Sequence, residues 1–180
     1  MASKVLGFTG ADNQGIVGLE VEYDSVLQGT DGYILTVTDA NGIELKNTAE
    51  GRQESVPGND LYLTLDANIQ KYVQQEAEKT LIAKEAIGVS VIVMNPKNGE
   101  IYAMVNAPEY NLNEPYTLNV EPDEASTQTK QDALNRMWRN FCINDTYEPG
   151  SIFKTVTATA AFEKGVLTVE DTFSCPGYRI

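Results

Sequence analysis

The sequence predicts an α+β fold, an antiparallel sheet covered by helices, with a small α/β segment in front of it. Two apolar, β-branched segments at 88–95 and 100–107 flank the turn sequence Pro-Lys-Asn-Gly, which is typical of a hairpin. A helical pattern precedes this hairpin at 66–81, and another follows it at 151–164. Because hairpin and helices alternate along one stretch of chain, we expect them to pack in layers.

The leading part of the chain carries shorter signals. Apolar residues at helical spacing predict one short helix over 18–29, which ends at a glycine. Segments 33–39 and 43–46 flank an Asn-Gly pair and are predicted to be paired strands. The polar segment 47–59 is interpreted as a connector.

This connector supplies the predicted domain boundary, between the end of a leading domain over 1–56 and the truncated start of a main domain over 57–180. The main domain opens with a predicted strand over 61–65 and a long helix capped by Asp66. Strand 89–94 is apolar almost without interruption, which predicts cover on both of its faces. One side of the long helix carries apolar residues at steps of four: Ile69, Val73, Ala77 and Leu81.

The chain after the hairpin is less regular. Segment 108–130 contains three prolines and little periodicity, so we expect a long surface loop. A short helix is predicted around 131–138. Three aromatic residues in and beyond that helix are interpreted as core or groove packing: Trp138, Phe141 and Tyr147.

Composition excludes several classes of function. The chain has 180 residues, 42% of them hydrophobic, and a net charge of −13, which would repel a nucleic-acid backbone. No apolar run reaches the roughly 20 residues that cross a bilayer, so the chain itself is expected to be soluble. Histidine is absent, which excludes a Ser-His-Asp nucleophile and histidine-ligated metal. Cys142 and Cys175 are expected to be small apolar residues, and no cofactor or metal is expected.

The candidate catalytic residues are Ser151 and Lys154. Pro149 and Gly150 interrupt the chain, and Ser151 then begins an apolar helix that closes at Gly165. Residues three apart share a helix face, so the hydroxyl and the amine are neighbours where free backbone N–H groups favour developing negative charge. A serine hydroxyl needs a base, and a neutral lysine amine can take its proton.

A Ser-x-x-Lys sequence alone is weak evidence for a catalytic site. With this composition it arises by chance about one time in three, and an ordinary N-cap serine explains it equally well. Three further features support a catalytic site: the Pro-Gly pair, the helix that follows at once and the absence of histidine. On physical grounds the catalytic and the structural interpretation are then equally well supported.

Longer motifs in the chain are similar to those of a known protein family. The run Tyr-Glu-Pro-Gly-Ser-Ile-Phe-Lys at 147–154 is very similar to the Y-E-P-G-S-x-F-K box around the active serine of class B penicillin-binding proteins. Segment 18–32 resembles the G-L-E-x-x-Y-D-x-x-L-x-G-x-x-G element of their pedestal. Segments 57–81 and 91–111 resemble the opening strand, long helix and first hairpin of their transpeptidase domain.

The resemblance implies a partial penicillin-binding transpeptidase fold after a pedestal-like segment. It implies that Ser151 attacks the penultimate D-Ala of a peptidoglycan stem peptide, that Lys154 is its proton-transfer partner, and that β-lactams acylate the same serine. For the longer parent protein it implies a place on the outer face of the bacterial cytoplasmic membrane, and it is compatible with a membrane glycosyltransferase partner.

The sequence departs from the family pattern in one respect. The family also needs a Ser-x-Asn and a Lys-Thr-Gly or Lys-Ser-Gly after the serine, and neither is present here. The chain alone is therefore expected to be an inactive structural fragment, and the surface left without its strands could drive self-association. A β-lactam sensor or serine β-lactamase shares the Ser-x-x-Lys chemistry and stays open as a further alternative.

Overall fold

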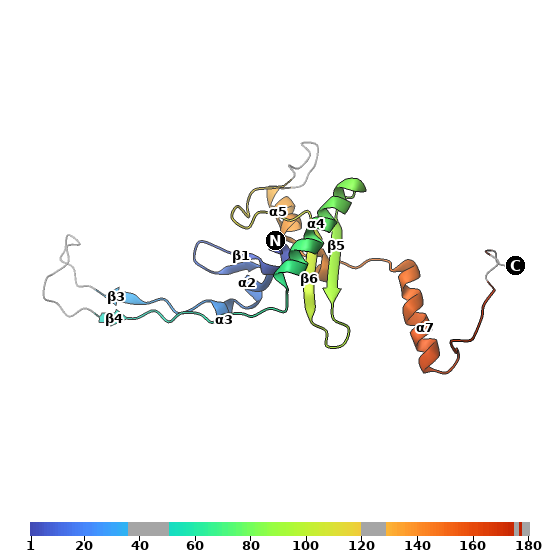
Figure 1. The fold of residues 1–180 in the computed structure, drawn as a ribbon. Coiled ribbons are helices and arrows are strands. Elements are labelled where there is room, and N and C mark those ends of the chain that lie inside the picture. The colour runs from blue at the N-terminus through green and yellow to red at the C-terminus, as the bar shows by residue number, and fades with distance from the viewer. Residues whose placement is uncertain (36–50, 120–128, 175–176, 178–180) are drawn as a thin grey trace. The chain divides into compact units, whose positions relative to one another are not determined.

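The computed structural model describes residues 1–35, 51–119, 129–174 and 177, and the chain divides into two compact units, Met1–Asp145 and Thr146–Ile180 (Figure 1). The secondary structure of the described residues consists of helices and antiparallel strand pairs, which confirms the predicted α+β class. Within these residues no helix is both long enough and apolar enough to cross a membrane.

A hairpin and one long helix form the centre of the first unit. Strands β5 (Val89–Met94) and β6 (Ile101–Ala107) pair antiparallel, and α4 (Ala67–Ala83) lies across them (Figure 1). Asp66 caps α4 as predicted, because its carboxylate accepts hydrogen bonds from the backbone N–H groups of the second and third helical residues at 2.8 and 2.9 Å. The core between helix and hairpin contains Ala77, Val105 and Ala107, with Val73, Leu81, Val89 and Val91 packed against it.

The cover predicted for both faces of β5 is wrong. Along this strand half-buried and exposed residues alternate, and Ile92 and Met94 are 48% and 54% exposed. Helix α4 covers one face of the hairpin, and on the other face α6 (Phe141–Asn144) contacts β6 and the start of β5 only. The apolar run of β5 therefore marks one half-buried face against α4 and one face that is largely exposed.

Segment 61–65, predicted as a strand, is not one. It runs beside the start of β6 but makes little backbone pairing there: Thr64 Oγ1 donates to the Ile101 carbonyl at 2.8 Å, and the Asp66 N–H donates to the Tyr102 carbonyl at 2.9 Å. A single main-chain hydrogen bond is too few for a ladder. The segment is an extended lead into α4.

A second core joins residues that are far apart in the sequence. Phe8 of β1 (Phe8–Thr9) meets Trp138 of α5 (Lys130–Trp138) edge-to-face, with ring centroids 5.1 Å apart. Tyr110 is only 4% exposed in this cluster, and the Trp138 indole N–H donates to the Pro115 carbonyl at 2.8 Å. The described first part of the surface loop predicted over 108–130 has no helix or strand, as expected, and half of its residues are exposed, but Tyr110, Leu112 and Leu118 contribute side chains to this core. The helix predicted near 131–138 is confirmed and begins with a capping box between Thr129 and Asp132.

The leading elements are shorter than predicted. Helix α1 (Ser3–Leu6) precedes β1, and β2 (Gly15–Val17) pairs with β1. The single helix predicted over 18–29 is two helices, α2 (Gly18–Glu22) and α3 (Asp24–Leu27). The break has a cause in the sequence, because the Asp24 carboxylate accepts the Gly15 N–H at 2.7 Å and ties the start of α3 to β2.

The connector predicted over 47–59 contains a strand. Strand β4 (Gly51–Gln53) pairs antiparallel with β3 (Tyr33–Leu35), and Thr30 forms an isolated bridge with Val56. The predicted strand 43–46, the rest of 33–39 and the Asn-Gly turn between them lie outside the described residues. An antiparallel ladder near this point is thus observed, with its second strand later in the chain than predicted.

Candidate active site

Ser151 lies in a short turn that leads directly into a helix. The 3₁₀ turn η1 (Gly150–Ile152) is followed without a gap by α7 (Phe153–Glu163). Gly150 has a φ of 53°, a left-handed conformation that suits glycine, and Gly165 closes the helix with a φ of 64°. The predicted helix and its glycine end are confirmed, with the refinement that Ser151 belongs to the 3₁₀ turn.

Ser151 and Lys154 lie three residues apart, the spacing that brings two side chains to one face of a helical turn. Both side chains are exposed. Within the described part of the second unit, no hydrogen bond joins the Ser151 hydroxyl to the Lys154 amine. Both residues lie on one turn at the start of the helix, and their catalytic roles stay a prediction.

The start of α7 can stabilise negative charge. The first backbone N–H groups of a helix have no partner within it, and the helix dipole places partial positive charge at the same end. No side chain caps η1 or α7. An oxyanion that forms on a carbonyl attacked by Ser151 would lie at this positive end.

Apolar side chains around Ser151 are exposed to solvent. Ile152 and Phe153 are 65% and 55% exposed, and Tyr147, predicted to pack in a core or groove, is 74% exposed. The reason is that none of the described residues in the second unit is buried, so this unit offers Tyr147 no core. Trp138 is buried as predicted, and Phe141 is half-buried.

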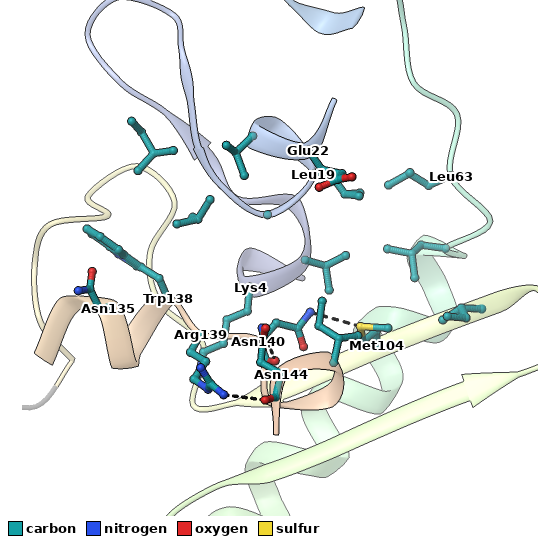
Figure 2. A pocket seen from close by; sticks show the side chains of 18 of the residues that line it. Lys4, Leu19, Glu22, Leu63, Met104, Asn135, Trp138, Arg139, Asn140 and Asn144 are labelled. Atoms are coloured by element: carbon teal, nitrogen blue, oxygen red, sulfur yellow. Dashed lines mark hydrogen bonds between the residues drawn. The ribbon is translucent and has the colours of Figure 1, made fainter. Parts of the chain in front are cut away.

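A cavity of about 750 Å³ lies within the first unit and is separate from Ser151 in sequence and lining (Figure 2). Its wall combines apolar residues of α2 and segment 63–65 with polar residues of α5 and α6. Figure 2 shows Lys4, Arg139 and Asn140 on the same side of this space. Neither candidate catalytic residue lines it.

Lys4 is an unpredicted feature of this cavity. Its side chain is buried, and its ammonium lies 4.7 Å from the centroid of the Phe141 ring. Burial lowers the pKa of Lys4, an effect opposed by the negative charge of Glu109. The Glu109 carboxylate itself accepts the Ser3 N–H at 2.8 Å. Lys4 lies in the four-residue helix α1, which is too short to show a periodicity that would signal its burial.

Three buried amides were also not predicted from the sequence. Gln70 of α4 donates to the Met104 carbonyl at 2.9 Å and accepts the Met104 N–H at 2.8 Å. Asn106 of β6 donates to the side-chain oxygen of Asn140 at 2.9 Å. All three are at most 5% exposed. Each amide occupies a position that propensity alone assigns to solvent.

The cysteine interpretation holds for the described cysteine. Cys142 is half-buried, and its thiol donates to the Val105 carbonyl at 3.5 Å. Burial raises the pKa of Cys142, so the thiol stays protonated at neutral pH. Cys175 lies outside the described residues. Among residues that are described, no group of three or more acidic or cysteine side chains is placed to hold a metal ion.

Comparison with known proteins gives a consistent result. A family model described as penicillin binding protein transpeptidase domain matches residues 89–180, and one described as penicillin-binding protein dimerisation domain matches residues 2–63. Stage V sporulation protein D of Bacillus subtilis is 36% identical over 90% of this chain and 23% of its own length. Peptidoglycan D,D-transpeptidase FtsI of Escherichia coli K12 is 29% identical over 100% of this chain and 28% of its own length.

Solved structures agree in fold. Penicillin binding protein 3 of Mycobacterium tuberculosis, in complex with aztreonam, matches with a TM-score of 0.70 and 29% identity over 98% of this chain and 32% of that one. Penicillin binding protein 2X of Streptococcus thermophilus matches with a TM-score of 0.67 and 29% identity over 96% of this chain and 25% of that one. The chain spans about a quarter of the length of the curated relatives it matches. The family match covers residues 89–180 and includes the Ser151 turn, so the chain belongs to the penicillin-binding protein transpeptidase family.

Proposed function

We propose that this chain is part of a serine D,D-transpeptidase that cross-links peptidoglycan, with Ser151 as nucleophile and Lys154 as its proton-transfer partner. The observation that carries the proposal is the position of both residues on one turn at the start of α7, inside the segment that matches the transpeptidase family. Histidine is absent from the sequence, and Lys154, three residues after Ser151 in the Ser-x-x-Lys sequence, is the proposed base.

The chemistry follows from the two side chains. Ser151 Oγ bonds to the carbonyl carbon of the penultimate D-Ala of a stem peptide, and the hydroxyl proton passes to the neutral amine of Lys154. The C–N bond to the terminal D-Ala breaks, and that proton leaves with its amine. The amine of a second stem peptide then attacks the acyl-serine, forms the cross-link and restores the hydroxyl. A β-lactam acylates Ser151 by the same first step.

The proposal includes the domain division and the setting of the longer protein. Residues 1–56 are the end of a pedestal and 57–180 the start of the transpeptidase domain; in support, the dimerisation match ends nearby, at residue 63, and the transpeptidase match begins later, at residue 89. The longer protein acts at the outer face of the cytoplasmic membrane, beside a membrane glycosyltransferase. Cross-linking in intact cells tests this setting: a protein recovered only from the cytoplasm, with no glycosyltransferase attached, contradicts it.

A fluorescent penicillin tests the nucleophile in the longer protein. We expect Ser151→Ala to abolish labelling and to leave the unfolding transition unchanged, because the Ser151 side chain is exposed. Lys154→Ala should slow labelling strongly, whereas Lys164→Ala, at the far end of the same helix, should not. General-base groups contribute about 10²–10⁴-fold to rates, which sets the expected size of the Lys154 effect. Equal labelling after Ser151→Ala would remove the assignment.

The inactive-fragment alternative applies to the 180-residue chain alone. We expect it to take up little or no penicillin, because one turn and one helix do not enclose a substrate on all sides. Stoichiometric, Ser151-dependent labelling of the short chain would contradict this alternative. FtsI of Escherichia coli is named a peptidoglycan D,D-transpeptidase and the two solved structures are of penicillin-binding proteins, which favours that activity over a β-lactam sensor or β-lactamase.

Self-association of the chain alone is a further part of the proposal. The open face of β5 exposes Ile92 and Met94, and within the described residues β5 has an unpaired edge. We expect light scattering to show a mass that rises with concentration, and Ile92→Lys to reduce it. A monomer at every concentration would exclude self-association.

A further inference from the structure

The candidate nucleophile follows closely behind a short helix that is tied to the sheet by buried amides. Helix α6 (Phe141–Asn144) ends seven residues before Ser151, and Asp145 is the last residue of the first compact unit. The chain from Asp145 to Ser151 can span at most about 20 Å when fully extended. Whatever fixes Asp145 therefore limits where Ser151 can lie.

The tie is centred on Asn106 and Asn140. The Asn106 amide donates to Asn140 Oδ1 at 2.9 Å, and the backbone N–H of Cys142 is shared between Asn140 Oδ1 at 3.1 Å and Asn106 Oδ1 at 3.3 Å. Ser90 of β5 donates its hydroxyl to Asn106 at 3.3 Å. Both strands of the hairpin thus hold the first turn of α6.

Burial makes this arrangement costly to break. Asn106 is 1% exposed and Asn140 is 5% exposed. A buried amide that loses its partner keeps its full desolvation penalty, so the pair is stable only while both members remain together. The Asn140 amide also donates to the Met104 sulfur at 3.4 Å, a contact that Figure 2 shows.

Arg139 holds the end of α6, where the chain leaves toward Ser151. Its guanidinium forms an ion pair with the Asp145 carboxylate. It also donates to the Asn144 carbonyl at 2.6 Å, a contact that Figure 2 shows. The Asn144 amide in turn donates to the Asn140 carbonyl at 3.0 Å. Residues 139–145 therefore form a closed loop of contacts that is held to the sheet through Asn140 and Cys142.

Building on the proposed function, we propose that Asn106, Asn140 and Arg139 are positioning residues that fix the point from which the chain leads to Ser151. Without the tie, the last buried residue before the nucleophile is Trp138, and the free chain to Ser151 lengthens to a reach of about 45 Å. A longer tether leaves more positions open to Ser151, and acyl transfer requires the reacting atoms within a few tenths of an ångström of one geometry.

The structure offers a matched control for this inference. Gln70 is another buried amide that bonds to the same strand, through the backbone of Met104, but it holds α4 rather than α6. Gln70→Leu and Asn106→Leu each remove two or more hydrogen bonds from a buried site on β6. Both should lower the unfolding midpoint, and only Asn106→Leu should alter the approach to Ser151.

The experiment measures acylation of the longer protein by a fluorescent penicillin, with rate and saturation followed separately. We expect Asn106→Leu to lower the maximal acylation rate by roughly 10- to 100-fold, the range that a misplacement of about 1 Å can cause. Gln70→Leu should retain the wild-type rate. The pH at which the rate is half-maximal should not move, because neither variant alters a titrating group.

A surface pair keeps the test decisive if Asn106→Leu fails to fold. Arg139 is 46% exposed, so Arg139→Met removes the contacts with Asp145 and Asn144 without disturbing the core. Lys79→Met removes another surface ion pair, with Glu76 on α4, and is its control. We expect slower acylation for Arg139→Met only. Equal rates in Arg139→Met and Lys79→Met, or equal losses in Asn106→Leu and Gln70→Leu, overturn the positioning role.

The two proposals fail separately. If the wild-type protein is not labelled, or is labelled equally after Ser151→Ala, the proposed function is wrong. If wild-type labelling depends on Ser151 and the variants of the tie behave as their controls do, the nucleophile stands and the positioning role alone is wrong.

Discussion

The two compact units differ in how far they bury their apolar side chains. The first unit, Met1–Asp145, encloses two clusters, one of aromatic and large aliphatic residues around Phe8 and Trp138 and one between α4 and the hairpin. The second unit, Thr146–Ile180, has no buried residue among those described, and Val156 and Phe162 of α7 are 54% and 46% exposed. The residues proposed to carry the chemistry lie in the unit without a core.

The residues that stabilise the fold by burial and the residue proposed as nucleophile therefore lie in different units. An isolated helix of 11 residues is marginal in water, so α7 gains little stability from its own residues. The first unit contributes its packing and the tie at residues 139–145.

The largest expected change in stability comes from comparing one leucine in the first unit with one valine in the second. Leu134 is 5% exposed in the aromatic cluster, so Leu134→Ala should lower the free energy of unfolding by about 2–5 kcal/mol. Val156→Ala should change it by no more than about 0.5 kcal/mol, because that side chain is exposed. Urea unfolding followed by the fluorescence of Trp138, the single tryptophan, measures both.

The contrast breaks if Val156→Ala destabilises the protein as much as Leu134→Ala does. Such a result would mean that α7 packs against an apolar surface in solution. The comparison is sensitive because alanine is a better helix former than valine, which biases the Val156 variant toward a small gain.

A smaller effect tests how each helix is started. Helix α4 begins at a side-chain cap, whereas α7 follows a 3₁₀ turn without one. Asp66→Ala should lower the free energy of unfolding by about 1 kcal/mol, since two backbone N–H groups lose their acceptor. Asp60→Ala removes a nearby charge that caps no helix and is the control. Equal losses in the two variants would show that net charge, and not capping, is responsible.

Local patterns in the sequence predicted those elements whose causes are local. The Asp66 cap, the hairpin turn at 96–99 and the glycine end of α7 each depend on a few adjacent residues, and the structure confirms all three. The Ser151–Lys154 spacing was found in the same way. One turn of helix brings both residues together, whatever the rest of the chain does.

What the sequence did not predict depends on distant contacts. Phe8 and Tyr110 share a core across about a hundred residues, and no periodicity connects them. The Asn106–Asn140 pair was missed because an amide in a strand is normally assigned to the solvent face. The exposed face of β5 was missed because an apolar run does not reveal which neighbours cover it.

A test by pH concerns Tyr110, at the point where the loop after the hairpin enters the first core. Burial, with a smaller contribution from the charge of Glu109, raises the pKa of Tyr110 to about 12, and its hydroxyl donates to the Ser3 carbonyl at 3.0 Å. An unfolded tyrosine ionises near pH 10, so the folded state disfavours the phenolate. This contribution to stability is fully present below about pH 10 and is lost as the pH rises toward 12.

Urea titrations at neutral and alkaline pH measure this loss. Tyr110→Phe cannot ionise, so we expect a smaller fall in unfolding free energy between about pH 9 and about pH 11, together with a constant cost of about 0.5–1.5 kcal/mol from the lost hydrogen bond to Ser3. Tyr72→Phe, at a site 66% exposed, should leave the alkaline fall as it is in the wild type. If both substitutions leave the alkaline fall equal, Tyr110 ionises as freely as an exposed tyrosine, and the first unit is looser around this residue than its packing implies.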